Sequence, residues 1–358
     1  MAEERYGTWQ RWSEERLRLR AIVEFLRHKT VPIHRYSFVY YFGGITLFLF
    51  LVQVITGILL LLYYRPSADA AYESVQFIMS KVRFGWLIRS IHSWSANLMV
   101  GWVFVHMFST FFYRAYRRPR EFTWVSGALM LFLTLAFAFT GYLLPWNKLA
   151  FFATKVGTEI AGDVPLVGKY VMLLLRGGED VTEATLSRFF GIHVAILPAL
   201  ATVILGIHLA LVQVHGMSRP ISVRAEREIS FYPDFLLRDL AVWILVLALL
   251  GTLATLYPWP LGEKADPLAP APPGIKPEWY FLFMFQTLKL LPSKIFLFEG
   301  EMVGIMAFLV GGLVLLLVPF LDVWAQREQQ NRWVTTLGIL AVAYLVIMTI
   351  LGLALPAM

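Results

Sequence analysis

Hydrophobic residues in this chain are concentrated in seven long runs, and the segments between the runs hold all of its lysines and arginines. The hydrocarbon core of a bilayer is about 30 Å thick, so a helix needs roughly 20 apolar residues to cross it. Each run is long enough, and the pattern predicts an all-α membrane protein with seven transmembrane helices. The predicted spans are Tyr36–Tyr64, Ser90–Tyr113, Phe122–Trp146, Phe189–Gln213, Leu240–Pro260, Met302–Leu321 and Trp333–Leu355.

Composition narrows the class of protein further. Of the 358 residues, 58% are hydrophobic and 15% are charged, whereas soluble globular proteins average about 45–50% apolar and about 25% charged residues. That much apolar surface excludes a soluble enzyme, a disordered chain and a nucleic-acid-binding domain. The chain has no cysteine, which excludes disulfides, thiolate-bound zinc, iron–sulfur clusters held by this chain and cofactors attached through a thioether.

The distribution of basic residues predicts the orientation of the chain. Seven spans place its two ends on opposite sides of the membrane. The N-terminal segment and the loops on its side carry lysine and arginine at about twice the density of the other side. Basic loops face the cytoplasm and its anionic lipids, so we expect a multi-pass protein of a bacterial cytoplasmic membrane with a cytoplasmic N-terminus.

Four other segments are predicted not to cross the membrane. Trp9–Lys29 interleaves apolar residues with arginines, which is typical of an amphipathic helix on the cytoplasmic membrane surface; a surface helix packed on a partner is the alternative. Val164–Leu175 and Glu278–Leu290 are too short to span and are expected along the non-cytoplasmic face. Tyr257–Pro277 contains seven prolines and is predicted to be a structured loop.

Two of the predicted spans contain a pair of histidines each. His92 and His106 are 14 residues apart, which is about 21 Å of helix. His193 and His208 are 15 residues apart, or about 22 Å. Both helices run in the same direction, so His92 is level with His193, and the other two histidines are level deeper in the membrane. Two facing imidazoles at each level suit axial ligation of two haem irons, whereas a single buried histidine is more often a hydrogen-bonded packing residue.

Four glycines in the neighbouring spans have a matching spacing. Gly43 and Gly57 are 14 residues apart, as are Gly127 and Gly141. A flat macrocycle held among four helices requires helix backbone without side chains at two heights, so these glycines are predicted to contact haem. Ordinary close packing of helices through small residues is the alternative.

Specific motifs give this pattern a family resemblance. The spacings His92-x13-His106 and His193-x14-His208, followed by Pro277-Glu278-Trp279-Tyr280, resemble cytochrome b of the quinol-oxidising cytochrome bc complexes. Further stretches are similar to the b6f kind of that family. They are Gly43-Gly44-Ile45-Thr46-Leu47, Tyr63-Tyr64-Arg65-Pro66, Phe84-Gly85-Trp86-Leu87-Ile88-Arg89-Ser90 and Gly141-Tyr142-Leu143-Leu144-Pro145-Trp146.

The resemblance also implies a division of the chain. Residues 1–35 would form the N-terminal surface helix, and residues 36–215 a cytochrome b6-like four-helix bundle that holds two haems. Residues 216–358 would form a region of three helices similar to subunit IV, with its outer loop. In the b6f kind these two parts are usually separate chains, whereas here they are fused, and the eighth helix of the bc1 kind is absent.

In function, the resemblance implies a subunit of a proton-translocating quinol:cytochrome c-type oxidoreductase with two non-covalent b-type haems. Quinol would be oxidised on the outer side. One electron would pass to a Rieske iron–sulfur protein and on to a c-type cytochrome subunit, and the other would pass through both haems to a quinone site on the cytoplasmic side. The family also implies a homodimer within a multi-subunit complex embedded in membrane lipid.

The resemblance also suggests roles for residues on the outer side. Glu278 lies at the edge of an apolar segment, where burial would raise its pKa and suit it as a proton acceptor; an exposed carboxylate at a helix start is the alternative. Tyr280 and Tyr142 are candidates for the same pocket. Arg89 would pair with a haem propionate or anchor the helix at the membrane edge.

On the cytoplasmic side, Arg238 and Asp239 are candidates for quinone or proton handling, with a simple charge pair as the alternative. His34 and His215 lie at the same interface, and each is interpreted as a surface histidine.

Two positions depart from the b6f pattern. Tyr41 stands where that kind has the cysteine of a third, covalent haem, and Ser109 stands where it has the arginine partner of the inner haem, a role for which Arg114 or Arg117 could substitute.

Two other functions fit the same histidines. A di-haem membrane anchor of a dehydrogenase or hydrogenase would pass electrons to quinone without the outer pocket that divides them. A haem-free proton-coupled transporter would use the histidines as proton relays. The Pro277–Tyr280 motif argues against the anchor, and the optical spectrum of the purified protein distinguishes the transporter.

Overall fold

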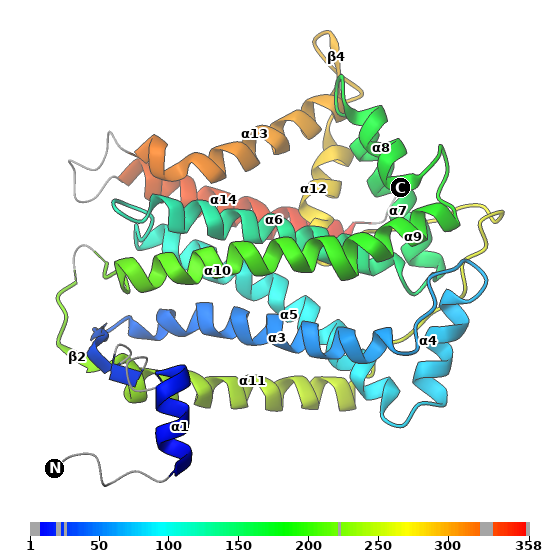
Figure 1. Ribbon diagram of the computed structural model, residues 1–358. Coiled ribbons are helices and arrows are strands. Elements are labelled where there is room, and N and C mark those ends of the chain that lie inside the picture. Colours follow the sequence, from blue (N-terminus) through cyan, green and yellow to red (C-terminus); the bar gives the residue numbers. More distant parts are fainter. Residues whose placement is uncertain (1–7, 19–22, 25–26, 221–222, 323–331, 356–358) are drawn as a thin grey trace, which may run out of the picture.

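The computed structural model describes residues 8–18, 23–24, 27–220, 223–322 and 332–355. Within these residues, seven helices are long and apolar enough to cross a membrane, which confirms the predicted fold class. They are α3 (Tyr41–Leu61), α5 (Gly85–Phe112), α6 (Glu121–Leu143), α9 (Glu183–Gly191) continued by α10 (Leu197–His215), α11 (Leu236–Leu256), α13 (Gly300–Leu321) and α14 (Arg332–Ala354). Figure 1 shows them side by side, with α1 (Thr8–Leu17) and the described end of α14 at opposite ends of the bundle.

The four helices that contain the histidines and the matching glycines form two packed pairs. α3 lies along α5, and α6 lies along α10, with α5 also packing on α6. α11 covers the outside of the first pair, where Leu49 and Leu250 are fully buried. The helix faces directed away from these contacts remain apolar: Ile244 and Leu245 are 67% and 69% exposed. Exposed leucine and isoleucine along whole helices require lipid as their solvent.

The connections on the side opposite the N-terminus contain the short helices. They are α4 (Ala71–Ser80), α7 (Lys148–Gly162), α8 (Gly168–Arg176) and α12 (Trp279–Leu290). α4, α7 and α8 gather at one end of the bundle in Figure 1. The predicted non-spanning segments Val164–Leu175 and Glu278–Leu290 therefore form α8 and α12, both too short to cross. The proline-rich segment Tyr257–Pro277 contains no helix, as predicted.

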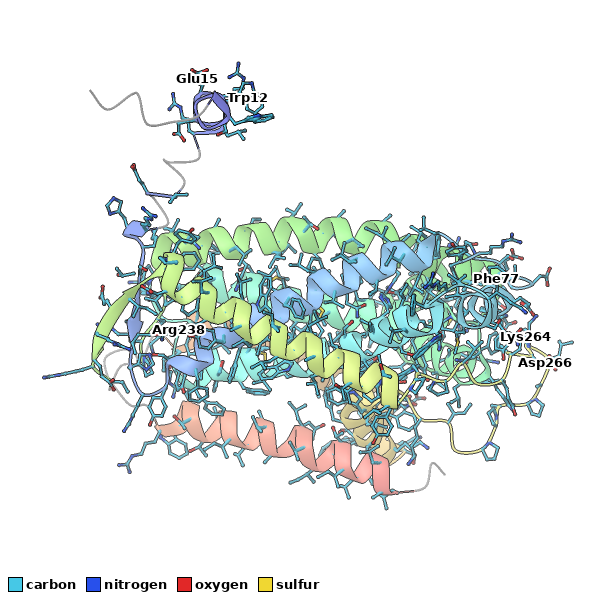
Figure 2. All side chains as sticks on the ribbon, turned by 90° about the horizontal axis from the view of Figure 1, so that it is seen from below. Trp12, Glu15, Phe77, Arg238, Lys264 and Asp266 are labelled. Carbon is cyan, nitrogen blue, oxygen red and sulfur yellow. The ribbon has the colours of Figure 1, made fainter. Side chains whose placement is uncertain are left out.

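The N-terminal helix is shorter than the sequence predicts. α1 (Thr8–Leu17) ends at Leu17 because Arg18 adopts a left-handed backbone conformation with φ of 46°. Parts of the predicted Trp9–Lys29 helix, at 19–22 and 25–26, lie outside the described residues. In Figure 2, α1 with Trp12 and Glu15 stands apart from the bundle.

Two small antiparallel sheets complete the described fold. β1 (Thr30–Ile33) pairs with β2 (Arg227–Ser230) and ties the N-terminal segment to the start of α11. β3 (Lys294–Ile295) pairs with β4 (Phe298–Glu299) in a hairpin just before α13.

The proline-rich loop is held against the four-helix bundle mainly by the start of α5. The Ser90 hydroxyl accepts a hydrogen bond from the Trp259 backbone N–H over 3.0 Å, and the Trp94 indole donates to the Tyr257 carbonyl over 2.9 Å. Asn147 donates to the Leu261 carbonyl over 2.8 Å. These bonds fix a long loop without secondary structure over the outer ends of α5 and α6.

Candidate functional site

The structure brings the four histidines together in the two predicted pairs. His92 and His193 line one cavity of about 430 Å³ between the helix pairs. All four side chains are half-buried. His92 and His193 are close enough to interact electrostatically, as are His106 and His208. The helices therefore place two imidazoles opposite each other at two depths.

Hydrogen bonds to hydroxyl groups orient three of the four rings. The Nδ1 atom of His92 lies 2.8 Å from the Thr56 hydroxyl on α3. On α6, Thr140 and Ser126 hold the Nδ1 atoms of His193 and His208 at 3.1 Å and 3.0 Å respectively. These bonds fix the direction in which the opposite nitrogen, Nε2, points.

The hydroxyl protons also fix which ring nitrogen carries hydrogen. Thr56 donates its own proton to the Val52 carbonyl over 2.6 Å, and Thr140 donates to the Ala136 carbonyl over 2.8 Å. Each hydroxyl oxygen is then free only to accept, so Nδ1 of the histidine must be the donor. This arrangement leaves Nε2 unprotonated, which is the form that binds a metal. The residues therefore fit axial ligation of haem iron.

A π-turn contains His193. The helix from Glu183 to His215 is interrupted at Ile192–Ile196 by i→i+5 hydrogen bonding, and Pro198, which cannot donate a backbone hydrogen bond, follows at the start of α10. A π-turn accommodates one extra residue in a helix. With one residue taken up by the π-turn, the 15 residues between His193 and His208 give the same rotation about the helix axis as the 14 between His92 and His106. Both imidazoles of each helix therefore face the same side.

The glycines lie directly against the imidazoles. A Cβ atom on Gly141 would be 2.6 Å from Cε1 of His193, and one on Gly43 would be 3.2 Å from Cε1 of His106. The matching distances are 3.3 Å for Gly127 against His208 and 3.4 Å for Gly57 against His92. The four positions thus leave room for the ligand rings themselves, while contact with the macrocycle remains a prediction.

The predicted outer-site residues line the same cavity as the outer histidine pair. Glu278, Tyr280 and Tyr142 all contribute to it. Burial raises the pKa of Glu278, and a hydrogen bond from Tyr142 partly opposes that shift. Burial, with Glu278 adding to it, also raises the pKa of Tyr280. Glu278 is half-buried at the N-terminal end of α12 and is not the fully exposed carboxylate of the alternative.

Arg89 is buried beside this cavity but has backbone partners. Its guanidinium donates to the Trp259 carbonyl over 2.7 Å and to the Pro260 carbonyl over 3.1 Å. Arg89 therefore anchors the outer loop, and pairing with a haem propionate remains a prediction that would use its remaining N–H groups.

At the other end of the bundle, Arg238 is exposed (labelled in Figure 2), whereas the neighbouring Asp239 is half-buried. A Cβ on Gly44 would lie 2.2 Å from Oδ1 of Asp239, so the carboxylate packs on α3 one residue from Gly43. Oδ1 of Asp239 is buried without a hydrogen-bond partner among the described residues. The described ion pairs include none between Arg238 and Asp239, so the simple charge-pair alternative is wrong.

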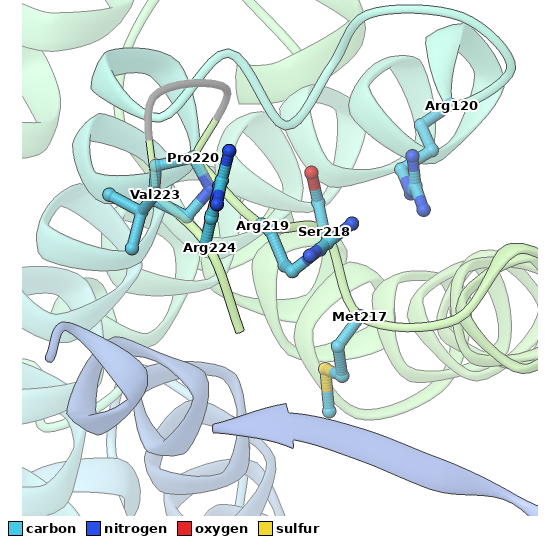
Figure 3. A pocket seen from close by; sticks show the side chains of 7 residues that line it. All are labelled: Arg120, Met217, Ser218, Arg219, Pro220, Val223 and Arg224. Atoms are coloured by element: carbon cyan, nitrogen blue, oxygen red, sulfur yellow. The ribbon is translucent and has the colours of Figure 1, made fainter. Parts of the chain in front are cut away.

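A second cavity, of about 480 Å³, lies near this end and is rich in arginine (Figure 3). Arg120, Arg219 and Arg224 line it, and Arg120 also donates to the His215 carbonyl over 2.9 Å. Neither Arg238 nor Asp239 lines this cavity.

Interpreting His34 as a surface histidine was wrong. The side chain is 3% exposed, and Nε2 lies 2.8 Å from the Tyr40 hydroxyl. Burial lowers the pKa of His34, and Arg219 adds to that shift. The Tyr40 hydroxyl also donates to the Ser218 carbonyl over 2.9 Å, a contact between distant segments that the local sequence does not predict.

The two arginines considered for the inner haem have other partners. Arg114 donates to the Tyr116 hydroxyl over 3.0 Å and to Thr335 over 2.9 Å. Arg117 forms a 2.9 Å ion pair with the buried Asp322. Both connect the α5–α6 loop to α13 and α14, so neither supports the predicted propionate role.

Sequence reasoning missed the three hydroxyl residues. Their signal is position: Thr56, Ser126 and Thr140 directly precede Gly57, Gly127 and Gly141. The fourth glycine, Gly43, follows a phenylalanine instead.

Comparison with known proteins now decides the family. Residues 27–216 match the family model described as cytochrome b/b6/petB, and residues 264–358 match the one described as cytochrome b (C-terminal)/b6/petD. This chain belongs to the cytochrome b family. The fusion of cytochrome b6 and subunit IV parts in one chain, predicted from the motifs, is confirmed by these two matches.

Similar proteins and a solved structure support the same assignment. A cytochrome bc complex cytochrome b subunit of Chlorobaculum thiosulfatiphilum is 51% identical over 344 residues, covering 94% of this chain and 79% of that protein. A cytochrome b6 of Synechococcus elongatus is 45% identical over 210 residues, covering 59% of this chain and 97% of its own length. A solved structure described as a hyperthermophilic respiratory Complex III superposes with a TM-score of 0.83 at 33% identity, covering 97% of this chain and 91% of that one. This cytochrome b is therefore a multi-pass subunit of a bc-type quinol-oxidising complex.

Proposed function

We propose that this cytochrome b oxidises quinol in the outer cavity and divides its two electrons between two routes. One electron would go to a Rieske iron–sulfur partner and on to a c-type cytochrome, and the other would cross the membrane to a quinone site at the cytoplasmic end. The observation that carries the proposal is the single cavity that Glu278 shares with His92 and His193.

Glu278 is the proton acceptor of the proposed reaction. Quinol loses two protons with its two electrons, and a half-buried carboxylate with a raised pKa takes up a proton near neutral pH better than an exposed one. The Tyr142 hydroxyl, which donates to Glu278, holds the carboxylate in the cavity. The indole of Trp279 donates to Asn97 over 2.9 Å and fixes the start of α12 against α5.

The four imidazoles provide the route for the second electron. Bound haems would supply one-electron carriers at the two depths. His92 and His193 would hold the outer one with Thr56 and Thr140 fixing their rings, and His106 and His208 would hold the inner one. The glycines beside these rings leave the space that the ligands occupy.

Asp239 is the proposed proton donor at the cytoplasmic end. Its carboxylate oxygen is buried against Gly44 of α3 and lacks a partner among the described residues. Proton uptake here and release from Glu278 on the outer side would build a proton gradient, if the basic N-terminal side is cytoplasmic.

Substitution of Glu278 by glutamine tests this function. Removing the proton acceptor should lower quinol oxidation about 10²-fold or more, the usual contribution of a general base, while both haems stay bound. Activity is measured as quinol:cytochrome c reduction by the purified complex.

Glu263→Gln is the matched control because Glu263 belongs to the same outer loop but is exposed, and its ion pair among the described residues is with Lys148 over 3.2 Å. It should keep full activity. Unchanged quinol oxidation in the Glu278→Gln complex would instead favour a di-haem anchor that lacks an outer quinol site.

A further inference from the structure

The four ligand imidazoles do not receive equal support. His92, His193 and His208 each have a hydroxyl oxygen within 2.8–3.1 Å of Nδ1. Nδ1 of His106 is buried and has no hydrogen-bond partner among the residues that the structure describes. One ligand of the inner pair is therefore different from the other three.

The register of α3 explains this difference. Gly57 faces His92, and the residue before it, Thr56, reaches Nδ1 of that ring. Fourteen residues earlier, Gly43 faces His106, and the residue before it is Phe42. The Phe42 ring packs against Trp102 at 5.1 Å between centroids. An apolar side chain thus occupies the position that carries a hydroxyl beside the other three rings.

A hydrogen bond from Nδ1–H makes an imidazole a stronger electron donor at Nε2. A stronger donor stabilises ferric over ferrous iron, so it lowers the reduction potential of a haem that it ligates. The outer pair has two such bonds, whereas the inner pair has one. The difference favours reduction of the inner site.

We propose that Thr56, Thr140 and Ser126 are positioning residues that set the reduction potentials of the two haem sites through their imidazoles. Phe42 withholds the fourth hydrogen bond and biases the electron toward the inner site. This inference rests on the proposed haem binding and adds a cause for the direction of transfer across the membrane.

Removal of a hydroxyl at the outer site tests the first half. Thr56→Ala should raise the midpoint potential of the outer haem and leave that of the inner haem unchanged, as measured by redox titration of the purified complex. Thr56→Ser, which keeps the hydroxyl, should restore the original value. Thr252→Ala is the control, because Thr252 makes the same bond to a carbonyl four residues earlier, over 2.9 Å, but lies on α11 away from the histidines.

Addition of a hydroxyl at the inner site tests the second half. Phe42→Ser and Phe42→Ala leave the same space, so they differ in the hydroxyl alone. The serine variant should have the lower inner-haem potential of the two, with a change in the g values of that haem in electron paramagnetic resonance. Ser126→Ala should raise the inner-haem potential.

The outcomes separate this inference from the function on which it rests. Purified wild-type protein without b-type haem would overturn the proposed function. A full haem complement with equal outer-haem potentials in Thr56→Ala and wild type would overturn the inference alone. If neither Phe42 variant assembles, the haem potentials of Thr56→Ala and Ser126→Ala still show whether the hydroxyl groups set the reduction potentials.

Discussion

Each of the four glycines beside the histidines tolerates a different amount of added volume. A Cβ at Gly141 would approach the His193 ring to 2.6 Å, whereas one at Gly57 would make an ordinary contact of 3.4 Å with His92. Both glycines serve the same outer pair. The distances therefore predict that alanine at Gly141 disturbs the outer histidine pair more than alanine at Gly57 does.

Gly141→Ala should lose much of the outer haem, because the His193 ring must move out of its position, while Gly57→Ala should keep nearly all of it. Haem content per chain, determined from the pyridine haemochrome, measures both. Gly206→Ala is the control, since nothing lies within 4 Å of a Cβ there. Equal haem loss at Gly141 and Gly57 would contradict the ranking.

The pH dependence of quinol oxidation follows from the Tyr142–Glu278 hydrogen bond. That bond lowers a Glu278 pKa that burial has raised. The active base is deprotonated, so the rate falls as pH drops through this pKa. Tyr142→Phe removes the lowering effect, and the acid limb of the rate profile should move to higher pH. A limb that stays in place or moves to lower pH would show that Tyr142 does not act through Glu278.

At the scale of single residues, the sequence predicted those site residues whose side chains are rare inside a membrane. Charged and imidazole side chains within spans stand out, because burial there is costly without a function. The hydroxyls of Thr56 and Thr140 did not stand out, since threonine in a span commonly bonds its own helix. The partners of Arg89 could not be predicted, because Trp259 and Pro260 are distant in the sequence.

At the scale of the element, the π-turn at Ile192–Ile196 reconciles two helices with different histidine spacing. Its signal in the sequence is the extra residue between His193 and His208 together with Pro198. The hydrophobic pattern alone located all seven spans but misplaced several ends. α5 begins at Gly85 rather than Ser90 and α9 begins at Glu183 rather than Phe189, because helices continue beyond the apolar core into the interface.

The π-turn makes a prediction about helix length. Deletion of Val194 should give a regular helix with the histidines still in phase, so both haems should remain. Insertion of an alanine after Val194 should rotate His193 by about 100° relative to His208 and remove one haem. Haem quantitation of both variants checks this, and equal haem content in the two would contradict the role of the π-turn.

At the scale of the whole molecule, contacts at both ends join the part similar to cytochrome b6 to the part similar to subunit IV. The outer loop binds the start of α5 through Arg89 and Ser90. At the other end, Asp322 accepts hydrogen bonds of 2.9 Å from both Tyr116 and Arg117. The family motifs predicted that both parts are present in the chain. They did not predict these contacts, because the contacts join residues about 170 and 205 positions apart and no local sequence pattern encodes such a pairing.

Asp322→Ala should weaken the attachment of α13. The ion pair with Arg117 is largely buried, with side-chain exposures of 2% and 11%, and loss of one partner from such a pair costs roughly 3–5 kcal/mol. The temperature at which the complex loses its native haem spectrum should fall clearly. Glu121→Gln breaks the 3.5 Å pair with the exposed Arg118; such a surface pair is worth about 0–1 kcal/mol, so that temperature should stay nearly unchanged. Equal transition temperatures for the two variants would argue that Asp322 is not an anchor.

The central claim is that two stacked imidazole pairs each hold one haem. Reduced-minus-oxidised spectroscopy with haem quantitation on the purified complex tests it most directly. The account predicts two b-type haems per copy of this chain, both extractable by acidified solvent because the chain has no cysteine to bind them covalently. A spectrum without a reduced b-type band, or a single b haem per chain, would contradict it.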